Sequence, residues 1–228
     1  VREFGLLWHQ DRRSRIVSRL RDGARATTGA LARELGVSRE TVRRDLLSLE
    51  AEGLLTSRPG TGGGTFVHAP SAERAAALLG NYFYFQRLTV ADIYQVRQAL
   101  EPELAATLAG RLTAAQIAAL EANIAEYDRP PGNAEEERDQ HVASLRFHRL
   151  LASHGQNPLL GFLIDFMASM LADLTVTRRL YEPRNFDLWR SGRDYQRELL
   201  AALRRGDSAA ARRIMAAHMA TAQALMQA

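Results

Sequence analysis

Arginine side chains gather between residues 39 and 44 in a pattern that suits contact with DNA. Arg39, Arg43 and Arg44 surround the hydroxyl group of Thr41 in one short segment. A guanidinium group donates two parallel hydrogen bonds to a guanine edge, and it also pairs with phosphate oxygens. At the start of a helix, these side chains would meet base edges in the major groove. The alternative is an ordinary amphipathic helix whose arginines are only solvated.

The residues around this group predict the helix-turn-helix that would position it. Ala32 is small enough for two helices to approach closely, and Gly36 permits the tight turn between them. Ser38 is a suitable N-cap for a third helix that runs to about residue 52. Its apolar positions recur with the period of a buried helical stripe, and they are Val42, Leu46 and Leu49.

A β-hairpin is predicted after this helix, because two short extended runs flank the glycine-rich segment 58–64. Such a wing would let Arg58 and the neighbouring glycines approach the sugar-phosphate backbone. The predicted DNA-contacting residues are Ser38, Arg39, Thr41, Arg43, Arg44, Arg58, Gly62 and Gly63.

Charge separates the two parts of the chain. All 30 basic residues are arginines; residues 1–70 hold 12 of them with 8 acidic residues, whereas the remainder is balanced at 18 and 18. A positive excess confined to the first third is expected where only that part meets a polyanion.

The remainder of the chain predicts helices and no strand ladder. The segments are 72–85, 89–109, 113–127, 134–154, 157–180, 186–205 and 208–227, with Thr89, Thr113 and Asp207 as N-caps. The fold is therefore expected to be mostly α. It comprises a winged helix-turn-helix with a small β-hairpin wing over 1–69, a linker over 70–75 and an all-α helical bundle over 76–228.

Several classes of protein are disfavoured by what the sequence lacks. It has no cysteine, so disulfides and thiolate metal sites are excluded. It has no signal-peptide pattern and no run near 18 apolar residues, so we expect a cytoplasmic protein without a membrane partner. It has no activated nucleophile, paired carboxylates or phosphate loop, which disfavours an enzyme. The alternative from that class is a helical metal-dependent enzyme with a DNA-binding appendage.

Residues 31–67 resemble the DNA-binding domain of the GntR family of transcriptional regulators. The resemblance rests on Val37-Ser38-Arg39, on the segment Leu46 to Leu54, and on the wing from Gly62 to Val67. It implies that Ser38, Arg39 and the wing contact DNA. The segment 41–46 also resembles the DeoR family of sugar-metabolism regulators, which is the alternative within this class.

The second part of the chain resembles the FadR-type C-terminal domain, called FCD. The resemblance rests on residues 88–102, on Phe147-His148, and on the closing segment from Leu199 to His218. It disfavours DeoR-type proteins, whose second domain is α/β. It also implies a homodimer that binds a double-stranded operator, as a repressor, and a helical domain that binds a small-molecule effector.

In that family an aspartate and three histidines usually bind a divalent metal inside the bundle. Here His148 and His218 keep two of these positions, while Ser144 and Gln196 replace the others. His148 and His218 are therefore candidate ligands for zinc, nickel or manganese, with His141 as a further donor on the same helix face. The alternative is a metal-free polar pocket in which both histidines are hydrogen-bonded.

Arg97 is a further pocket candidate. In the family, the matching arginine points into the cavity and can bind a carboxylate, so the resemblance implies a small organic acid as effector. The alternative is an ion pair with Glu101 one turn later on the same helix. The predicted effector-binding residues are Arg97, Ser144, His148, Gln196 and His218.

Overall fold

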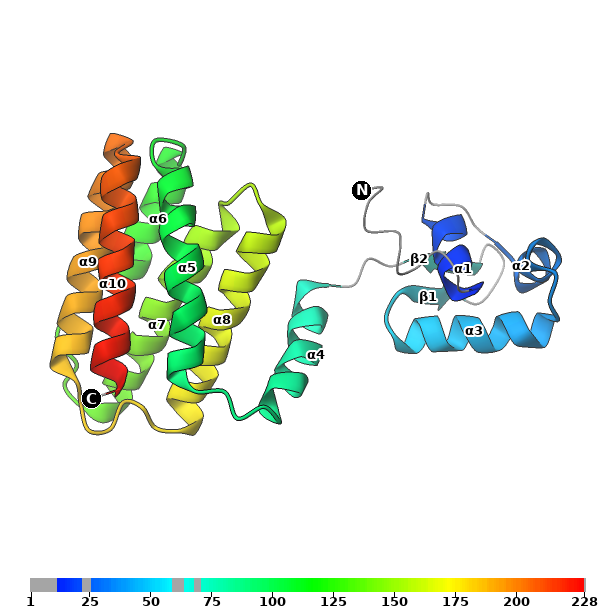
Figure 1. Cartoon of the computed structure of the whole chain (residues 1–228), viewed down its shortest axis with the longest axis horizontal. Coiled ribbons are helices and arrows are strands. Elements are labelled where there is room, and N and C mark those ends of the chain that lie inside the picture. The colour runs from blue at the N-terminus through cyan, green and yellow to red at the C-terminus, as the bar shows by residue number, and fades with distance from the viewer. Residues whose placement is uncertain (1–11, 22–25, 59–63, 68–70, 228) are drawn as a thin grey trace. The chain divides into compact units, whose positions relative to one another are not determined.

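The computed structural model describes residues 12–21, 26–58, 64–67 and 71–227. The chain divides into two compact units, residues 1–77 and 78–228 (Figure 1). The described helices and strands are α1 (Arg12–Leu20), α2 (Thr28–Leu35), α3 (Arg39–Ala51), β1 (Leu55–Arg58), β2 (Gly64–Val67), α4 (Ala72–Tyr84), α5 (Val90–Leu108), α6 (Ala114–Ala125), α7 (Ala134–Ser153), α8 (Pro158–Thr177), α9 (Phe186–Arg205) and α10 (Ser208–Gln227).

Helices α2 and α3 form the predicted helix-turn-helix. The C-cap Gly36 of α2 has a left-handed backbone with φ of 69°, a conformation that glycine adopts at little cost. The Ser38 hydroxyl then accepts a hydrogen bond from the Thr41 amide and caps α3. The core of the unit joins all three helices and the hairpin through buried residues that include Ile16, Leu31, Val42, Leu49 and Leu55.

The predicted wing is an antiparallel hairpin of β1 and β2. Its register pairs Leu55 with Val67 at one end and Arg58 with Gly64 at the other. Ala26 forms an additional antiparallel bridge to Thr65, which ties the segment before α2 to the hairpin.

The second unit is a helical bundle. From α5, each helix contacts the next around a closed ring in the order α10, α9, α6, α7, α8 and back to α5. Thr89 and Thr113 cap α5 and α6 as predicted, and each forms a capping box. The Asp207 carboxylate accepts from the Ala210 amide at the start of α10. The interior of the ring is filled by aliphatic side chains from every one of these helices.

Helix α8 is more apolar than its burial requires. Its most apolar stretch of 18 residues has a mean hydropathy of 1.8, so the helix is long and apolar enough, by length and composition, to cross a membrane. Only 33% of that stretch is buried. It packs on α5 and α7 in the bundle. Phe83 of α4 packs on Phe166 of α8, while Tyr84 and Phe85 remain largely exposed.

The predicted helices agree with the structure to within a few residues, because their caps and breaks are local signals. Helix α4 begins at Ala72, inside the segment 70–75 expected as a linker, and the boundary between the units falls after Ala77.

Candidate functional site

The N-terminal end of α3 presents a group of exposed cationic side chains. Arg39, Arg43 and Arg44 are exposed, and within the described parts of the chain none of them forms an ion pair. The Ser38 and Thr41 hydroxyl groups lie 2.8 Å apart at the helix start. The end of α3 therefore offers free guanidinium groups beside a capped helix N-terminus, an arrangement that suits base edges and phosphates.

Other arginines of the same unit are used to hold it together. Arg12 of α1 forms a bidentate pair with the nearly buried Asp45 of α3. Arg13 also reaches the C-terminal end of α3, where its guanidinium donates to Ser48 and lies 2.6 Å from the carboxylate of the C-cap Glu52. Arg12 and Arg13 thus join α1 to α3, whereas the exposed arginines of α3 remain available to a binding partner.

The wing is described only in part. Arg58 ends β1, and its side chain lies outside the described atoms, as do Gly62 and Gly63. The DNA contacts expected of these three residues stay predictions.

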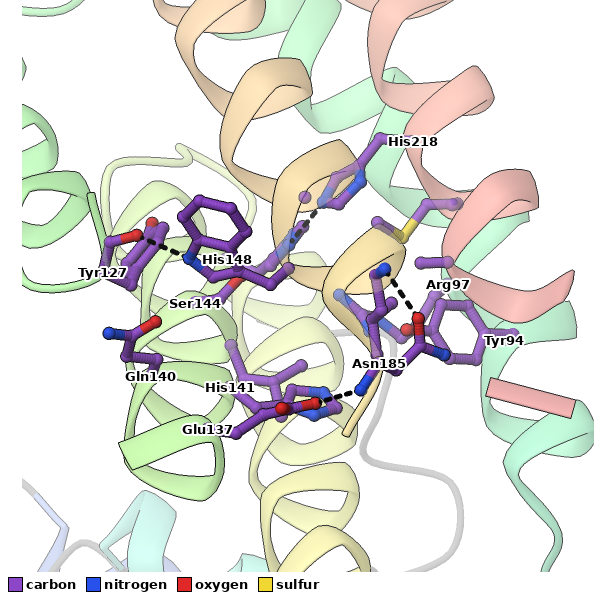
Figure 2. Close-up of a pocket in the computed structure, with 16 residues that line it drawn as sticks. Tyr94, Arg97, Tyr127, Glu137, Gln140, His141, Ser144, His148, Asn185 and His218 are labelled. Carbon is purple, nitrogen blue, oxygen red and sulfur yellow. Dashed lines mark hydrogen bonds between the residues drawn. The ribbon is translucent and has the colours of Figure 1, made fainter. Parts of the chain in front are cut away.

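The bundle contains a pocket between its helices (Figure 2). Its walls come from α5, α7, α9 and α10, together with Tyr127 after α6 and Asn185 before α9. The lining residues are Tyr94, Arg97, Tyr127, Glu137, Gln140, His141, Ser144, Leu145, His148, Asn185, Leu188, Trp189, Gly192, His218, Met219 and Ala222. Predicted residues Arg97, Ser144, His148 and His218 thus meet in one place.

One face of α7 supplies most of the polar wall. Glu137, His141, Ser144 and His148 follow one another at intervals of four, three and four residues, which places them along a single helical stripe. Burial and the nearby Arg97 charge lower the pKa of His141 to about 4, so this imidazole is neutral at neutral pH.

The buried carboxylate of Glu101 contacts both Arg97 and His148. The Arg97 Nε donates to Glu101 Oε1 at 2.6 Å, and the other Glu101 oxygen lies 2.5 Å from His148 Nδ1. Burial would raise the pKa of Glu101, but Arg97 and His148 outweigh it and hold that pKa at about 2. Burial lowers the pKa of His148, so its neutral ring donates Nδ1–H to the carboxylate and keeps a lone pair on Nε2.

Gln196 lies directly behind the cavity wall and contacts this lone pair. Its amide nitrogen lies 3.3 Å from His148 Nε2 and 3.2 Å from the Ser144 carbonyl oxygen. The Tyr127 hydroxyl donates to the amide oxygen at 2.7 Å. Because a flipped amide would set its oxygen against the Ser144 carbonyl, the NH₂ group must face Ser144 and His148. The two amide hydrogens therefore serve Ser144, through its carbonyl and hydroxyl oxygens, and His148 Nε2.

A divalent metal does not fit this arrangement. His148 Nε2 and His218 Nε2 lie 3.3 Å apart, but the amide NH₂ of Gln196 points at the same lone pair that a metal would need. In the described parts of the chain, no group of three or more His, Asp or Glu side chains is placed to hold a metal ion. Two imidazoles beside an amide donor do not make the closed ligand set that metal binding requires.

Arg97 pairs with Glu101 and also lines the cavity. Glu101 occupies only its Nε, and the side chain is 0% exposed with its guanidinium 4.9 Å from the Tyr94 ring centre. Its Nη1 and Nη2 atoms are buried and have no hydrogen-bond partner in the described structure. Since an unpaired buried donor is costly, these two nitrogens are available to donate to an acceptor.

Several lining residues were not predicted. Glu137 had a signal, because it lies four residues before His141 on the same face of α7. Asn185 and Tyr127 had none: Asn185 caps α9 and donates to the Leu225 carbonyl, and Tyr127 follows the end of α6. Their place in the wall depends on how the helices pack, which no local pattern specifies.

Comparison with known proteins identifies both units. The FCD domain family matches residues 92–221, and an HTH domain matches residues 12–64. The HTH-type transcriptional regulator LutR of Bacillus subtilis (strain 168) is 27% identical over 193 residues, which cover 83% of this chain and 85% of that protein. The Exu regulon transcriptional regulator of Escherichia coli (strain K12) is 29% identical over 192 residues, covering 83% and 70%.

Solved structures share the fold. A GntR protein of Streptococcus agalactiae has a TM-score of 0.66 and 20% identity, and the match covers 93% of this chain and 97% of that one. E. coli McbR/YncC has a TM-score of 0.51 and 22% identity, with 95% of each chain covered. Together with the helical second unit, these findings exclude the α/β architecture of a DeoR-type protein. The chain belongs to the FCD-domain transcriptional regulators of the GntR family.

Proposed function

We propose that this DNA-binding regulator is a repressor whose operator affinity is changed by a small carboxylate bound, without metal, in the cavity of the bundle. Arg97 is the observation that carries the proposal. Arg97 lines the cavity, and its Nη1 and Nη2 atoms are fully buried and lack partners among the described residues. A carboxylate accepts two parallel hydrogen bonds from such a fork.

The composition of the remaining cavity lining supports a small-molecule ligand. Apolar walls from Tyr94, Leu145, Trp189 and Met219 surround the polar groups, a composition typical of small-molecule sites. Glu101 holds the Arg97 guanidinium in place, so little side-chain entropy is lost when a ligand binds.

The DNA-binding part of the proposal depends on helix α3. We infer that Ser38, Arg39, Thr41, Arg43 and Arg44 contact the operator, with the wing beside them. Because regulators of this architecture read two half-sites, a homodimer would match a pseudo-palindromic operator. Such a protein acts where the chromosome lies, which in bacteria is the cytoplasm.

Exposed apolar residues of the second unit support a dimer. Tyr84 and Phe85 are 81% and 78% exposed, and Leu78 and Tyr82 are also more than half exposed. Phe83 of the same helix packs on Phe166 of α8, where Leu159 and Val176 are also exposed. A patch of this kind on a globular domain marks an association surface, and a second copy of the chain is the occupant we propose.

Binding of small acids tests the effector half of the proposal. Calorimetry with a series of carboxylates should give saturable binding to the wild-type protein, and Arg97→Lys should weaken it about 10- to 100-fold through loss of the bidentate fork. Lysine keeps a positive charge beside Glu101, so the bundle should still fold. Unchanged acid binding in Arg97→Lys would contradict the proposal.

A second variant tests whether weaker acid binding could result from misfolding alone. Arg97→Gln combined with Glu101→Gln removes both charges together, so no unpaired buried charge remains. This double variant should retain its helical content and melt cooperatively, but it should bind none of the acids. Acid binding by a folded double variant would show that the carboxylate is held elsewhere.

A further inference from the structure

The unpartnered polar atoms of the cavity fall into two kinds. Arg97 supplies donors, through Nη1 and Nη2, whereas Glu137 Oε2 and Gln140 Oε1 are acceptors. All of these atoms are buried, and none has a hydrogen-bond partner in the described parts of the chain. Glu137 is 6% exposed and Gln140 8%, so bulk solvent does not compensate them.

The surrounding structure fixes the acceptors. The Asn185 main-chain N–H donates to Glu137 Oε1 at 2.5 Å and so orients the carboxyl group with Oε2 free (Figure 2). The Gln140 amide nitrogen donates to the Arg129 carbonyl at 3.1 Å, which leaves its oxygen without a donor. Both residues line the same cavity as Arg97.

His218 supplies a further unpartnered atom in the cavity wall. Its Nδ1 is buried and has no hydrogen-bond partner in the described structure, while its Nε2 lies 3.3 Å from His148 Nε2. Glu137 Oε2 and Gln140 Oε1 therefore remain as the fixed acceptors of the cavity.

The charges around the cavity also favour a ligand that carries hydrogen-bond donors. Arg97 and Glu101 neutralise each other, and the histidines of the wall are neutral, so Glu137 is the one lining acid without a partner cation at hydrogen-bond distance among the described residues. A carboxylate with only an apolar tail would meet Arg97 but leave Glu137 Oε2 and Gln140 Oε1 without donors. That loss disfavours such a ligand.

We propose that the effector carries, besides its carboxylate, hydrogen-bond donors, either hydroxyl or amino groups, that bind Glu137 Oε2 and Gln140 Oε1. The effector class is thus a hydroxylated or amino-substituted acid. Arg97 binds its carboxylate, and the start of α7 reads the rest of the molecule. This inference rests on the proposed function, because it needs the carboxylate at Arg97.

Matched acids of equal chain length test the inference by calorimetry on the full-length protein. One set is butanoate, γ-hydroxybutanoate and γ-aminobutanoate; the other is hexanoate, gluconate and ε-aminohexanoate. In at least one set, a donor-bearing acid should bind roughly tenfold tighter than its unsubstituted partner.

Glu137→Gln is the decisive variant, because the Asn185 N–H would hold the new amide oxygen and turn the NH₂ group into the cavity. A free acceptor becomes a donor with almost no change of shape. The preference for donor-bearing acids should then disappear, while Arg97→Lys weakens binding of every acid. Glu135→Gln, at an exposed position on the same helix, is the control and should behave as wild type.

The outcomes separate the two proposals. If substituted and unsubstituted acids bind equally well, or if Glu137→Gln retains the preference, the inference is wrong and the carboxylate proposal stands. If the wild-type protein binds no acid of either set, the carboxylate proposal fails and the inference fails with it.

Discussion

At the scale of single residues, Gln196 determines whether the cavity can bind a metal ion. Its NH₂ group donates to the Ser144 carbonyl and to His148 Nε2, so the imidazole lone pair is already used. Glu101 fixes the same ring from the other side through Nδ1. A carboxylate behind a histidine often orients a metal ligand. Here it orients a hydrogen-bond acceptor for an amide.

Metal content follows from this network. The wild-type protein, purified without chelator, should contain far less than one equivalent of zinc, nickel or manganese by elemental analysis. Replacing both altered residues, Ser144→Asp with Gln196→His, should restore a four-ligand set with His148 and His218 and raise metal content toward one equivalent. Near-stoichiometric metal in the wild-type protein would show that the Gln196 amide does not exclude it.

Arg97 shows what the sequence could and could not predict at this scale. Its spacing to Glu101 predicted an ion pair, and the family resemblance predicted a pocket; the structure contains both features, because a guanidinium has donors left after one pairing. Glu137 could also have been predicted, because it lies four residues before His141 on the same face of α7. Asn185 and Tyr127 could not, since they join the wall through helix ends whose positions are set by packing.

At the scale of elements, the caps explain why the helices were predictable. Ser38, Thr89 and Thr113 each accept a hydrogen bond from the backbone three residues later, and Gly36 and Gly206 end helices in a left-handed conformation. These signals are local and survive in the sequence. The closed ring of the bundle is not local, and its order came only from the structure.

The apolar surface of α4 and α8 carries a prediction at this scale. Tyr84→Ser combined with Phe85→Ser should shift the protein from dimer to monomer, or weaken the dimer at least tenfold, because it removes two exposed aromatic side chains from the association surface. Light scattering across a dilution series measures the change.

Leu47→Ser is the matched control for this prediction, since it removes an exposed apolar side chain from α3 in the other unit. It should leave the mass unchanged. A wild-type protein that is monomeric at every concentration would contradict the proposed association surface, as would a double variant that dimerises like wild type.

At the scale of the whole molecule, the chain joins a DNA-reading unit to a ligand-binding unit. Effector binding can change operator affinity only if the liganded bundle favours one arrangement of the two readers over another. A carboxylate at Arg97 and donors at Glu137 would join α5 to the start of α7, and Glu137 is itself bonded to Asn185 before α9. The ligand would thereby bias the packing of three helices of the ring.

The most direct test is operator affinity measured by fluorescence anisotropy with and without a bound acid, on an operator selected from random DNA. Acid should weaken wild-type binding about tenfold or more. Arg43→Ala should bind about 10- to 100-fold more weakly with or without acid, because it lacks a base contact. Arg97→Lys should bind the operator as wild type does and show little response to acid. An operator affinity that acid leaves unchanged, or changes equally in Arg97→Lys, would contradict the account.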